Sequence, residues 1–387
     1  MFNIRTYNNI SDKGLSRLPK DAYNVSDNHE NPDAIILRSA KLHDIEIADA
    51  LRAVGRAGAG TNNVPVDRMS EKGVVVFNAP GANANAVKEL VIVGMLLACR
   101  NIIQAWEYAA NVQGTEEEQN KAVEDGKKKY VGYELPGRTL GVIGLGAIGV
   151  QIANVAVDLG MRVIGFDPTI TVKSAWKLSS GVQEMESVEE LLKQSDFITF
   201  HVPLIEETKD LLNAERIATM KDGAVVLNFA RDGIVNDDAV VEAIEKGKIH
   251  AYVTDFPSEK LKHKKNVIAL PHLGASTGEA EENCAIMVAD QIKDFLENGN
   301  IRNSVNFPNI KLPREGDSRL AVANRNMPDM VGQISHILGK AGTNIIHMRN
   351  ESRNGLAYTL IDLDVSISPD VLNKIKSIEG VLSARQI

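Results

Sequence analysis

The sequence contains only two cysteines, Cys99 and Cys284, which lie in apolar helical patterns and show no C-x-x-C spacing. Two such thiols cannot build a disulfide framework. We therefore expect both to be free and buried in a protein of a reducing compartment, the cytoplasm. We also expect no metal ion.

Long hydrophobic runs are absent. The longest, such as LVIVGMLLAC over residues 90–99, are well short of the ~20 residues that span a bilayer. The first residues, MFNIRTYNNISDKG, lack the basic, apolar and small-residue regions of a signal peptide. The net charge of −8 argues against a surface for nucleic acid or an anionic membrane. A local basic pocket for an anionic substrate stays compatible with it.

The 387 residues have the composition of a soluble globular protein and suffice for two or three domains. Apolar segments at 3–7, 33–39, 51–58 and 73–80 predict buried parallel strands in a first region. A single long helix is predicted to follow, from about residue 85 to residue 109, and a polar stretch ends it.

From Leu140 to about His272, strands and helices alternate regularly, which predicts a doubly wound parallel sheet. A helix of more than 20 residues is predicted over 276–299. Residues 309–317 have the composition of a linker. The last residues, 318–387, show the order strand, helix, strand, strand, helix, strand, which predicts a small ferredoxin-like unit.

A glycine fingerprint, G-x-G-x-x-G, stands at Gly144, Gly146 and Gly149 between an apolar strand and an amphipathic helix. Gly144 would make the turn, Gly146 would admit a pyrophosphate, and Gly149 would let helix and strand pack closely. Asp167 ends the next strand, where a carboxylate binds ribose hydroxyls and repels a 2′-phosphate. The alternative is a glycine-rich turn without a ligand, but strand, helix and carboxylate together favour NAD binding.

Three polar residues follow successive strands at the carboxyl edge of the same sheet: Arg231, Glu259 and His272. Each residue alone is compatible with a non-catalytic role: Arg231 as a surface cation, Glu259 as a solvated loop charge and His272 as a packed loop histidine. Together they form an acid–base set, in which the histidine takes a hydroxyl proton and the arginine holds a substrate carboxylate. The carboxylate would raise the pKa of the histidine and orient its ring.

Several motifs resemble the D-2-hydroxyacid dehydrogenase family: GLGAIG at 144–149, HVPL at 201–204, NFARDGIVND at 228–237 and PHLGAST at 271–277. The stretch GRAGAGTNNV at 55–64 and the C-terminal unit, which is similar to an ACT domain, resemble the branch that oxidises D-3-phosphoglycerate. The resemblance implies NAD-dependent oxidation to 3-phosphohydroxypyruvate, the first step of L-serine biosynthesis. It also implies roles for Arg231 in binding the substrate carboxylate and carbonyl, for His272 as acid–base, and for Glu259 as its partner.

The resemblance further implies a fold and a domain division. A discontinuous, flavodoxin-like substrate-binding domain, 1–98 and 285–308, would be interrupted by a Rossmann NAD-binding domain, 99–284. The linker, 309–317, would lead to the ACT-like regulatory domain, 318–387. The residues expected at NAD are Gly144, Gly146, Ala147, Ile148, Gly149, Asp167, His201, Val202, Pro203, Thr208, Ala230, Arg231, Asp255, His272 and Gly274. Family members read D-V-F before the catalytic glutamate, whereas this chain reads TDFPSEK, which puts Thr254 at the family's aspartate and Asp255 one position later.

A phosphorylated three-carbon acid carries about three negative charges, so its pocket needs more cation than Arg231 alone. Arg38 and Arg56 end strands of the first region, and Gly58 and Gly60 would expose N–H groups to an anion. A structural ion pair and a solvated strand end remain alternatives for the two arginines. The residues expected at the substrate are Arg38, Ser39, Arg56, Ala57, Gly58, Asn83, Arg231 and His272.

The C-terminal unit is expected to pair with a copy of itself, in a homodimer or homotetramer. The resemblance to an ACT domain adds L-serine as an effector at Asn324, Asn326 and Asn344, although Asp329 stands where the family has glycine. Two other functions stay open. One is reduction of glyoxylate or hydroxypyruvate, or turnover of another D-2-hydroxyacid. The other is NAD sensing by a non-catalytic binding protein of this fold.

Overall fold

The computed structural model describes residues 1–387, and contacts divide them into two compact units. Unit 1 comprises Met1–Asn83 and Gly278–Ile387, and unit 2 comprises Ala84–Thr277. These boundaries differ from the predicted domain division in three ways, of which the first is that residues 278–284 lie in unit 1 and not with the second sheet. The helix after residue 83 belongs with the second sheet, and the C-terminal residues group with the first.

Unit 1 contains a five-stranded parallel sheet of order β2-β1-β3-β4-β5, which is the order of the flavodoxin-like fold that the family resemblance implied. The strands are β1 (Phe2–Thr6), β2 (Tyr23–Ser26), β3 (Ala34–Leu37), β4 (Ala53–Arg56) and β5 (Val75–Asn78), with short helices α1 (Asp12–Leu15) and α2 (Val66–Glu71) between them. Strand β2 was not predicted. It lies at the edge of the sheet, where a strand is only partly buried and needs no continuous apolar segment.

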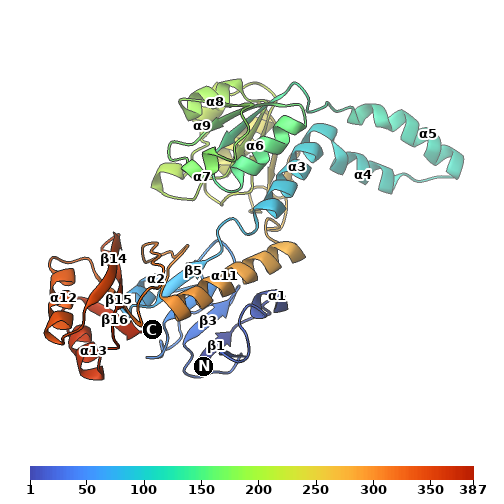
Figure 1. Ribbon diagram of the computed structural model, residues 1–387. Helices are drawn as coiled ribbons and strands as arrows, with labels where there is room; N and C mark the ends of the chain where they lie inside the picture. Colours follow the sequence, from blue (N-terminus) through green and yellow to red (C-terminus); the bar gives the residue numbers. More distant parts are fainter. The chain divides into compact units, whose positions relative to one another are not determined.

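Helix α11 (Gly278–Asn298) covers this sheet (Figure 1) and confirms the predicted long helix. Its buried face includes Ala285, Val288 and Ile292. Gly55 in β4 makes the close approach possible, because a Cβ there would overlap the Val288 side chain.

Unit 2 contains a seven-stranded parallel sheet of order β12-β11-β10-β9-β6-β7-β8. Its strands are β6 (Thr139–Ile143), β7 (Arg162–Phe166), β8 (Val182–Glu184), β9 (Phe197–Phe200), β10 (Ala224–Asn228), β11 (Ile249–Thr254) and β12 (Val267–Ala269). Its helices include α6 (Gly149–Asp158), α7 (Val172–Ala175), α8 (Val188–Gln194), α9 (Ala214–Thr219) and α10 (Asp237–Glu245). The chain reverses its direction of growth between β6 and β9, so the doubly wound prediction is confirmed, and dinucleotides bind at such a point.

The prediction of a single helix from residue 85 to residue 109 is wrong, because two helices cover this segment. The segment is divided at Asn101, whose φ of +49° is left-handed, into α3 (Ala84–Arg100) and α4 (Ile102–Asn111). The polar stretch after it is itself a helix, α5 (Glu116–Gly126), begun by a capping box between Thr115 and Glu118. Helices α4 and α5 project from the sheet as a pair (Figure 1). Helix α3 packs on α6, β10 and β11, which explains why it belongs to unit 2.

The C-terminal part of unit 1 is a four-stranded antiparallel sheet of order β14-β15-β13-β16 with two helices, which confirms the predicted βαββαβ unit. Its elements are β13 (Ser318–Arg325), α12 (Met330–Lys340), β14 (Ile345–Arg353), β15 (Leu356–Leu363), α13 (Pro369–Lys376) and β16 (Val381–Gln386). Residues of β13 and β15, among them Ala321 and Tyr358, share one core with Phe77 of the first sheet and Phe295 of α11.

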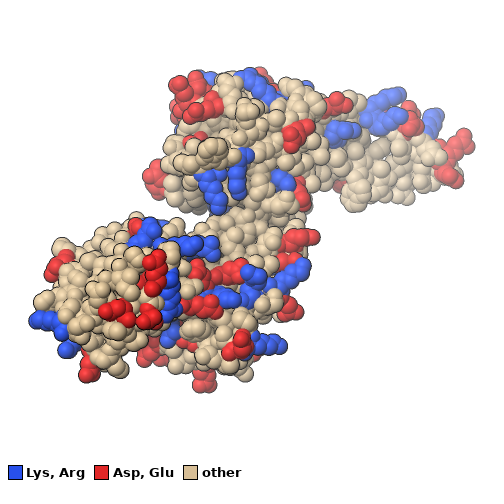
Figure 2. Space-filling model, viewed as in Figure 1, with Lys and Arg blue, Asp and Glu red and all other residues tan.

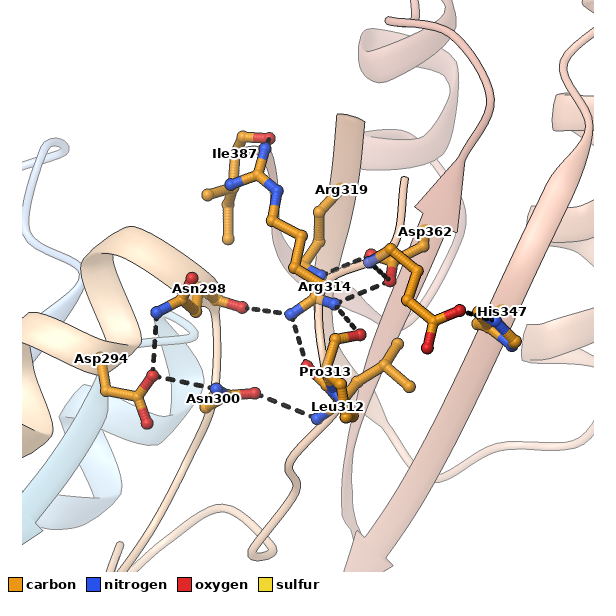
Figure 3. A network of polar contacts seen from close by, with 11 residues as sticks. Asp294, Asn298, Asn300, Leu312, Pro313, Arg314, Arg319, His347, Asp362 and Ile387 are labelled. Carbon is orange, nitrogen blue, oxygen red and sulfur yellow. Dashed lines mark hydrogen bonds and ion pairs between the residues drawn. The ribbon is translucent and has the colours of Figure 1, made fainter. Parts of the chain in front are cut away.

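Arg319 of β13 stands at the centre of a polar network in unit 1 (Figure 3). Its guanidinium pairs with Asp362 of β15 at 2.6 Å, with both side chains 0% exposed. Further Arg319 N–H groups donate to the carbonyl oxygens of Asn298, Leu312 and Pro313, each at 2.9 Å. Burial would raise the pKa of Asp362, but the bonds from Arg319 and from the Glu315 N–H lower it below its usual value. The segment predicted as a linker, 309–317, forms no helix or strand. Arg319 nevertheless fixes it, because its guanidinium donates to the carbonyl oxygens of Leu312 and Pro313.

Acidic and basic side chains are interspersed on the face of the molecule drawn in Figure 2. This distribution agrees with the modest net charge of −8. None of the helices is both long and apolar enough to cross a membrane.

Candidate active site

The glycine fingerprint lies where β6 turns into α6 at the switch point of the unit 2 sheet. Gly144 has a φ of +93°, and a Cβ there would lie 2.7 Å from the His201 carbonyl oxygen. A Cβ on Gly149 would overlap the Gly144 carbonyl oxygen. Both glycines are therefore required by the turn itself, for the conformational and packing reasons that the sequence indicated.

Gly146 differs from its two neighbours, because a Cβ on it would meet no protein atom within 4 Å. The space over this residue is open, although the turn does not need a glycine there. An open approach to the backbone at the start of a helix is what a pyrophosphate requires, since the free N–H groups and the helix dipole attract it. The turn thus fits the dinucleotide that the fingerprint predicts.

A cavity of about 720 Å³ opens beside this turn within unit 2. It is lined by Gly144, Gly146, Asp167, His201, Val202, Pro203 and Thr208, which were all expected at NAD. The Asp167 carboxylate accepts hydrogen bonds from the N–H groups of Leu145, at 2.8 Å, and Thr169, at 2.9 Å. These bonds fix the carboxylate at the end of β7, at the cavity wall.

Sequence reasoning missed the opposite wall of this cavity. Glu186, Ser187, Glu189 and Arg216 also line it, and Arg216 pairs with Glu189 at 2.8 Å. These residues belong to no fingerprint, and only the fold brings α8 and α9 to the cavity. The added carboxylates make the wall less suited to a 2′-phosphate, in agreement with NAD as the cofactor.

His201, which also lines this cavity, is held neutral. Burial lowers the pKa of its imidazole from 6.5 to about 3. Its Nε2 lies 2.8 Å from the Thr199 hydroxyl oxygen, and its Nδ1 is buried without a hydrogen-bond partner. An uncharged ring at this place leaves the electrostatics of the cavity to Asp167, the glutamates and Arg216.

We expect Gly146→Val to weaken NAD binding by about 100-fold, because the new side chain fills the space a pyrophosphate needs. The free energy of unfolding should stay unchanged, because a Cβ at this position meets no protein atom within 4 Å. Titration calorimetry with NAD and urea unfolding of the same sample would measure the two effects. Gly247→Val, at another glycine of unit 2 with open space around it, is a control for the added side chain but brings strain at its φ of +75°. Unchanged NAD affinity in Gly146→Val would contradict the assignment.

We expect acid to destabilise the protein through His201. The pKa of this group is lower in the folded state, so the unfolded chain binds more protons between pH 6.5 and about 3. The stability associated with the neutral ring is therefore complete above pH 6.5 and is lost as the pH falls toward 3. Urea unfolding at several pH values should show a shallower pH dependence for His201→Asn than for the natural protein; parallel curves would argue against this.

The three catalytic candidates lie at the carboxyl edge of the unit 2 sheet, as predicted. Arg231 follows β10 and is exposed. Its guanidinium donates to the Ala230 carbonyl oxygen at 2.6 Å, and the Arg231 carbonyl oxygen accepts from the Asn228 side-chain amide at 2.9 Å. His272 follows β12, and its ring lies 5.0 Å from that of Phe256. Arg231 and His272 are thus presented on loops with functional atoms accessible to a ligand.

Glu259 is not joined to His272 by any hydrogen bond or ion pair. Its side chain is 87% exposed and pairs with Lys262 at 2.5 Å. The carboxylate against the His272 loop is that of Asp255, which is 1% exposed and accepts from the Gly274 N–H at 2.9 Å. The Asp255 carbonyl also accepts from the His272 N–H at 2.9 Å, so Asp255 holds this loop at two points.

Asp255 retains one unused acceptor. Its Oδ1 is buried without a hydrogen-bond partner, and burial raises the pKa of its carboxyl above the usual value. The neighbouring Thr254 is also buried, and its hydroxyl accepts from the Phe256 N–H at 3.1 Å. Thr254 and Asp255 are the two residues where the chain departs from the family motif. The Thr254 hydroxyl is therefore used within the turn, whereas Asp255 keeps one carboxylate oxygen without a hydrogen bond.

The substrate candidates Arg38, Ser39, Arg56, Ala57, Gly58 and Asn83 belong to unit 1. Arg56 ends β4, and Gly58 leaves room for it, because a Cβ on Gly58 would overlap the Arg56 guanidinium. The expectation that Gly58 exposes its N–H is wrong, since this group donates to the Arg56 carbonyl at 2.8 Å. Asn83 has a buried amide oxygen without a hydrogen-bond partner.

Arg38 and Ser39 have partners of their own in unit 1. The Arg38 guanidinium pairs with Glu281 at 2.5 Å. The Asn8 side chain accepts from the Ser39 N–H at 3.0 Å and from the Ala40 N–H at 2.8 Å. The loop after β3 is therefore ordered by Asn8, and Arg38 is neutralised by α11.

The three effector candidates differ in their surroundings. Asn324 is buried, donates to the Arg325 carbonyl at 2.7 Å and has an amide oxygen without a partner, whereas Asn326 and Asn344 are exposed. Asp329 has a φ of +62° at the start of α12, a conformation that glycine adopts without strain. Its carboxylate lies against Gly332, where a Cβ would overlap it.

Comparison with known proteins covers both units. Residues 92–274 match the NAD binding domain of D-isomer specific 2-hydroxyacid dehydrogenases. A D-3-phosphoglycerate dehydrogenase of Haemophilus influenzae is 35% identical over 88% of this chain and 82% of its own length. One of Methanocaldococcus jannaschii is 41% identical over 74% of this chain, which spans only 54% of that relative.

A solved structure is similar as well. The 3-phosphoglycerate dehydrogenase of Entamoeba histolytica with bound NAD+ shows 25% sequence identity and a TM-score of 0.61, over 79% of this chain and 98% of that one. D-mandelate dehydrogenase of Rhodotorula graminis, at 23% identity and a TM-score of 0.68, shares the fold over 81% of this chain.

Proposed function

Because the chain belongs to the D-isomer specific 2-hydroxyacid dehydrogenase family, we propose that it oxidises D-3-phosphoglycerate to 3-phosphohydroxypyruvate with NAD. The observation that carries this choice of substrate is the similarity, over 88% of the chain, to a D-3-phosphoglycerate dehydrogenase. A reaction of this kind supplies the carbon skeleton for L-serine biosynthesis.

NAD, when bound, accepts a hydride from the carbon that carries the substrate hydroxyl. The turn at Gly144, Gly146 and Gly149 binds its pyrophosphate, and Asp167 its adenosine ribose. The remaining residues expected at NAD are Ala147, Ile148, His201, Val202, Pro203, Thr208, Ala230, Arg231, Asp255, His272 and Gly274. The free oxygen of Asp255 suits an amide donor such as the nicotinamide carboxamide.

In the proposed reaction the Arg231 guanidinium holds the substrate carboxylate, and an imidazole nitrogen of His272 accepts the proton of the substrate hydroxyl. Glu259 stabilises the resulting imidazolium, for which it has to leave Lys262. Because the exposed Glu259–Lys262 pair contributes little, this exchange costs little.

The substrate phosphate is proposed to bind in the domain formed by 1–98 and 285–308. Arg56, Ala57 and Gly58 after β4 and Asn83 are the residues that would contact the substrate, with Arg38 and Ser39 at the rim. Arg38 has to exchange Glu281 for the phosphate, which is the more highly charged partner.

We further propose a cytoplasmic homodimer or homotetramer with L-serine as effector at Asn324, Asn326 and Asn344. Exposed apolar side chains on α4, including Trp106 at 70% exposure, support an interface with a second copy. The free and buried state of Cys99 and Cys284 supports the reducing compartment.

The proposal is tested by following NADH formation with D-3-phosphoglycerate, D-glycerate and D-lactate as substrates. We expect kcat/KM to be at least about 100-fold higher for the phosphorylated acid, because its phosphate adds charged hydrogen bonds. A preference for D-glycerate or D-lactate would overturn the phosphate assignment and favour the reductase alternative. NAD binding without turnover of any acid would favour the sensor alternative.

A further inference from the structure

Unit 1 contains a second cavity, of about 400 Å³. It lies where the C-terminal sheet meets the first sheet. Its walls come from the segments that precede β4 and β5, from the end of α11, and from α13 and β16. None of the site residues predicted from the sequence lines it.

Cations dominate the lining of this cavity. Arg52, Lys72, Lys376 and Arg385 face a single carboxylate, that of Asp49. Lys72 and Lys376 take part in no ion pair, and Arg52 pairs only with Asp33, at 3.4 Å, which is outside the lining. Such an excess is notable in a chain of net charge −8, because gathered like charges repel unless an anion joins them.

Arg385 is held in a defined position by the end of α11. Its guanidinium donates to the carbonyl oxygens of Phe295 and Leu296 and stacks on the Phe295 ring, 4.6 Å from its centre. Two of the five guanidinium N–H donors make these bonds and the group also interacts with the Tyr358 hydroxyl, so donors remain for a ligand. Burial lowers the pKa of Arg385, and the repulsion from Arg52 lowers it further.

A buried hydroxyl completes the wall. Tyr358 is 2% exposed and lines the cavity, and its hydroxyl has no hydrogen-bond partner of normal geometry. The Arg385 guanidinium lies beside this hydroxyl, and a ligand oxygen in the cavity could accept a hydrogen bond from both groups.

A purely structural role accounts for part of this arrangement. Arg385 satisfies two carbonyls in the last turn of α11, as a basic residue at a helix C-terminus commonly does. That role does not explain why Lys72 and Lys376 line the same cavity without an ion-pair partner.

We propose that this cavity binds a small anion bearing a phosphate group. A phosphate matches the setting because its oxygens accept from a guanidinium, from lysine ammonium groups and from a tyrosine hydroxyl together. Its charge of about −2 offsets much of the local excess of cations. The same chemistry is offered by inorganic phosphate and by a phosphate monoester. The proposal is independent of the function proposed above.

A phosphate in this cavity contacts both parts of unit 1, because Arg52 and Lys72 precede strands of the first sheet, whereas Lys376 ends α13 and Arg385 belongs to β16 of the C-terminal unit. Binding therefore stabilises the association of the two sheets. The expected consequence is an increase in Tm with phosphate concentration.

The test is the rate of lysine acetylation in the full chain, followed by mass spectrometry with phosphate or with chloride at equal ionic strength. At about twice its dissociation constant, phosphate should slow the acetylation of Lys72 and Lys376 about threefold and leave the exposed Lys41 and Lys340 unchanged. Glycerol 2-phosphate in place of phosphate distinguishes an ester from the free ion. No slowing by either compound, or equal slowing of all four lysines, overturns the proposal.

A pair of variants provides the second readout. Phosphate should raise the Tm of Lys41→Met/Lys340→Met as in the natural protein, and this increase should be reduced by half or more in Lys72→Met/Lys376→Met. Both variants lose two exposed lysines that form no ion pair, so their folding is equally undemanding. An equal increase in both variants overturns the proposal, because phosphate bound at the active site would then account for it.

Discussion

Replacement of His272 by glutamine is expected to lower kcat by about three orders of magnitude. Glutamine preserves the polarity and approximate reach of the side chain but accepts no proton, so the substrate hydroxyl loses its base. The affinity for NAD should stay within about twofold, because the glycine turn and the cavity beside Asp167 are untouched. Steady-state NADH formation and calorimetric titration with NAD measure the two quantities.

His263→Asn is the matched control for this variant. His263 is an exposed loop histidine of the same unit, and its φ of +55° is one that asparagine tolerates. We expect its kcat to equal that of the natural protein. Retention of more than about a tenth of kcat in His272→Gln would exclude His272 as the base.

Replacement of Arg319 by methionine is expected to lower the free energy of unfolding of unit 1 by about 3–5 kcal/mol. The substitution leaves Asp362 as a buried carboxylate without its partner and deprives three backbone carbonyls of their donors. Urea unfolding followed by far-UV circular dichroism measures the effect.

The double variant Arg319→Met/Asp362→Leu separates the charge from the hydrogen bonds. Because it removes the unpaired charge, it should regain part of the lost stability, although the carbonyls of Asn298, Leu312 and Pro313 stay without donors. A change of less than about 1 kcal/mol in the single variant would contradict the central role of Arg319.

The periodic elements could be predicted from the sequence, because burial on both faces leaves continuous apolar segments such as those of β3 and β5. Helix α11 was predicted from apolar residues that recur on one helical face, and the C-terminal βαββαβ order from the alternation of such segments. The break at Asn101 was not, since the apolar pattern continues across it and only the backbone φ shows the division. Helix α5 was missed because its signal is a capping box without an apolar face.

The candidate site divides in the same way. Gly144 and Gly149 are needed by a local turn, so their spacing carries the information. Glu186, Glu189 and Arg216 reach the cavity from α8 and α9 by tertiary packing, which no local pattern records. The loop contacts of Asp255 were equally inaccessible, because they depend on β11 lying beside β12.

Helix α11 covers the first sheet, and two arginines of the C-terminal sheet donate hydrogen bonds to the carbonyls at its end. Arg385 satisfies the carbonyls of Phe295 and Leu296, and Arg319 that of Asn298. The C-terminal residues also fill part of the core around Phe77 and Phe295. Removal of the C-terminal sheet would therefore leave the last carbonyls of α11 without these donors, and a domain grafted in its place would need equivalent arginines to satisfy them.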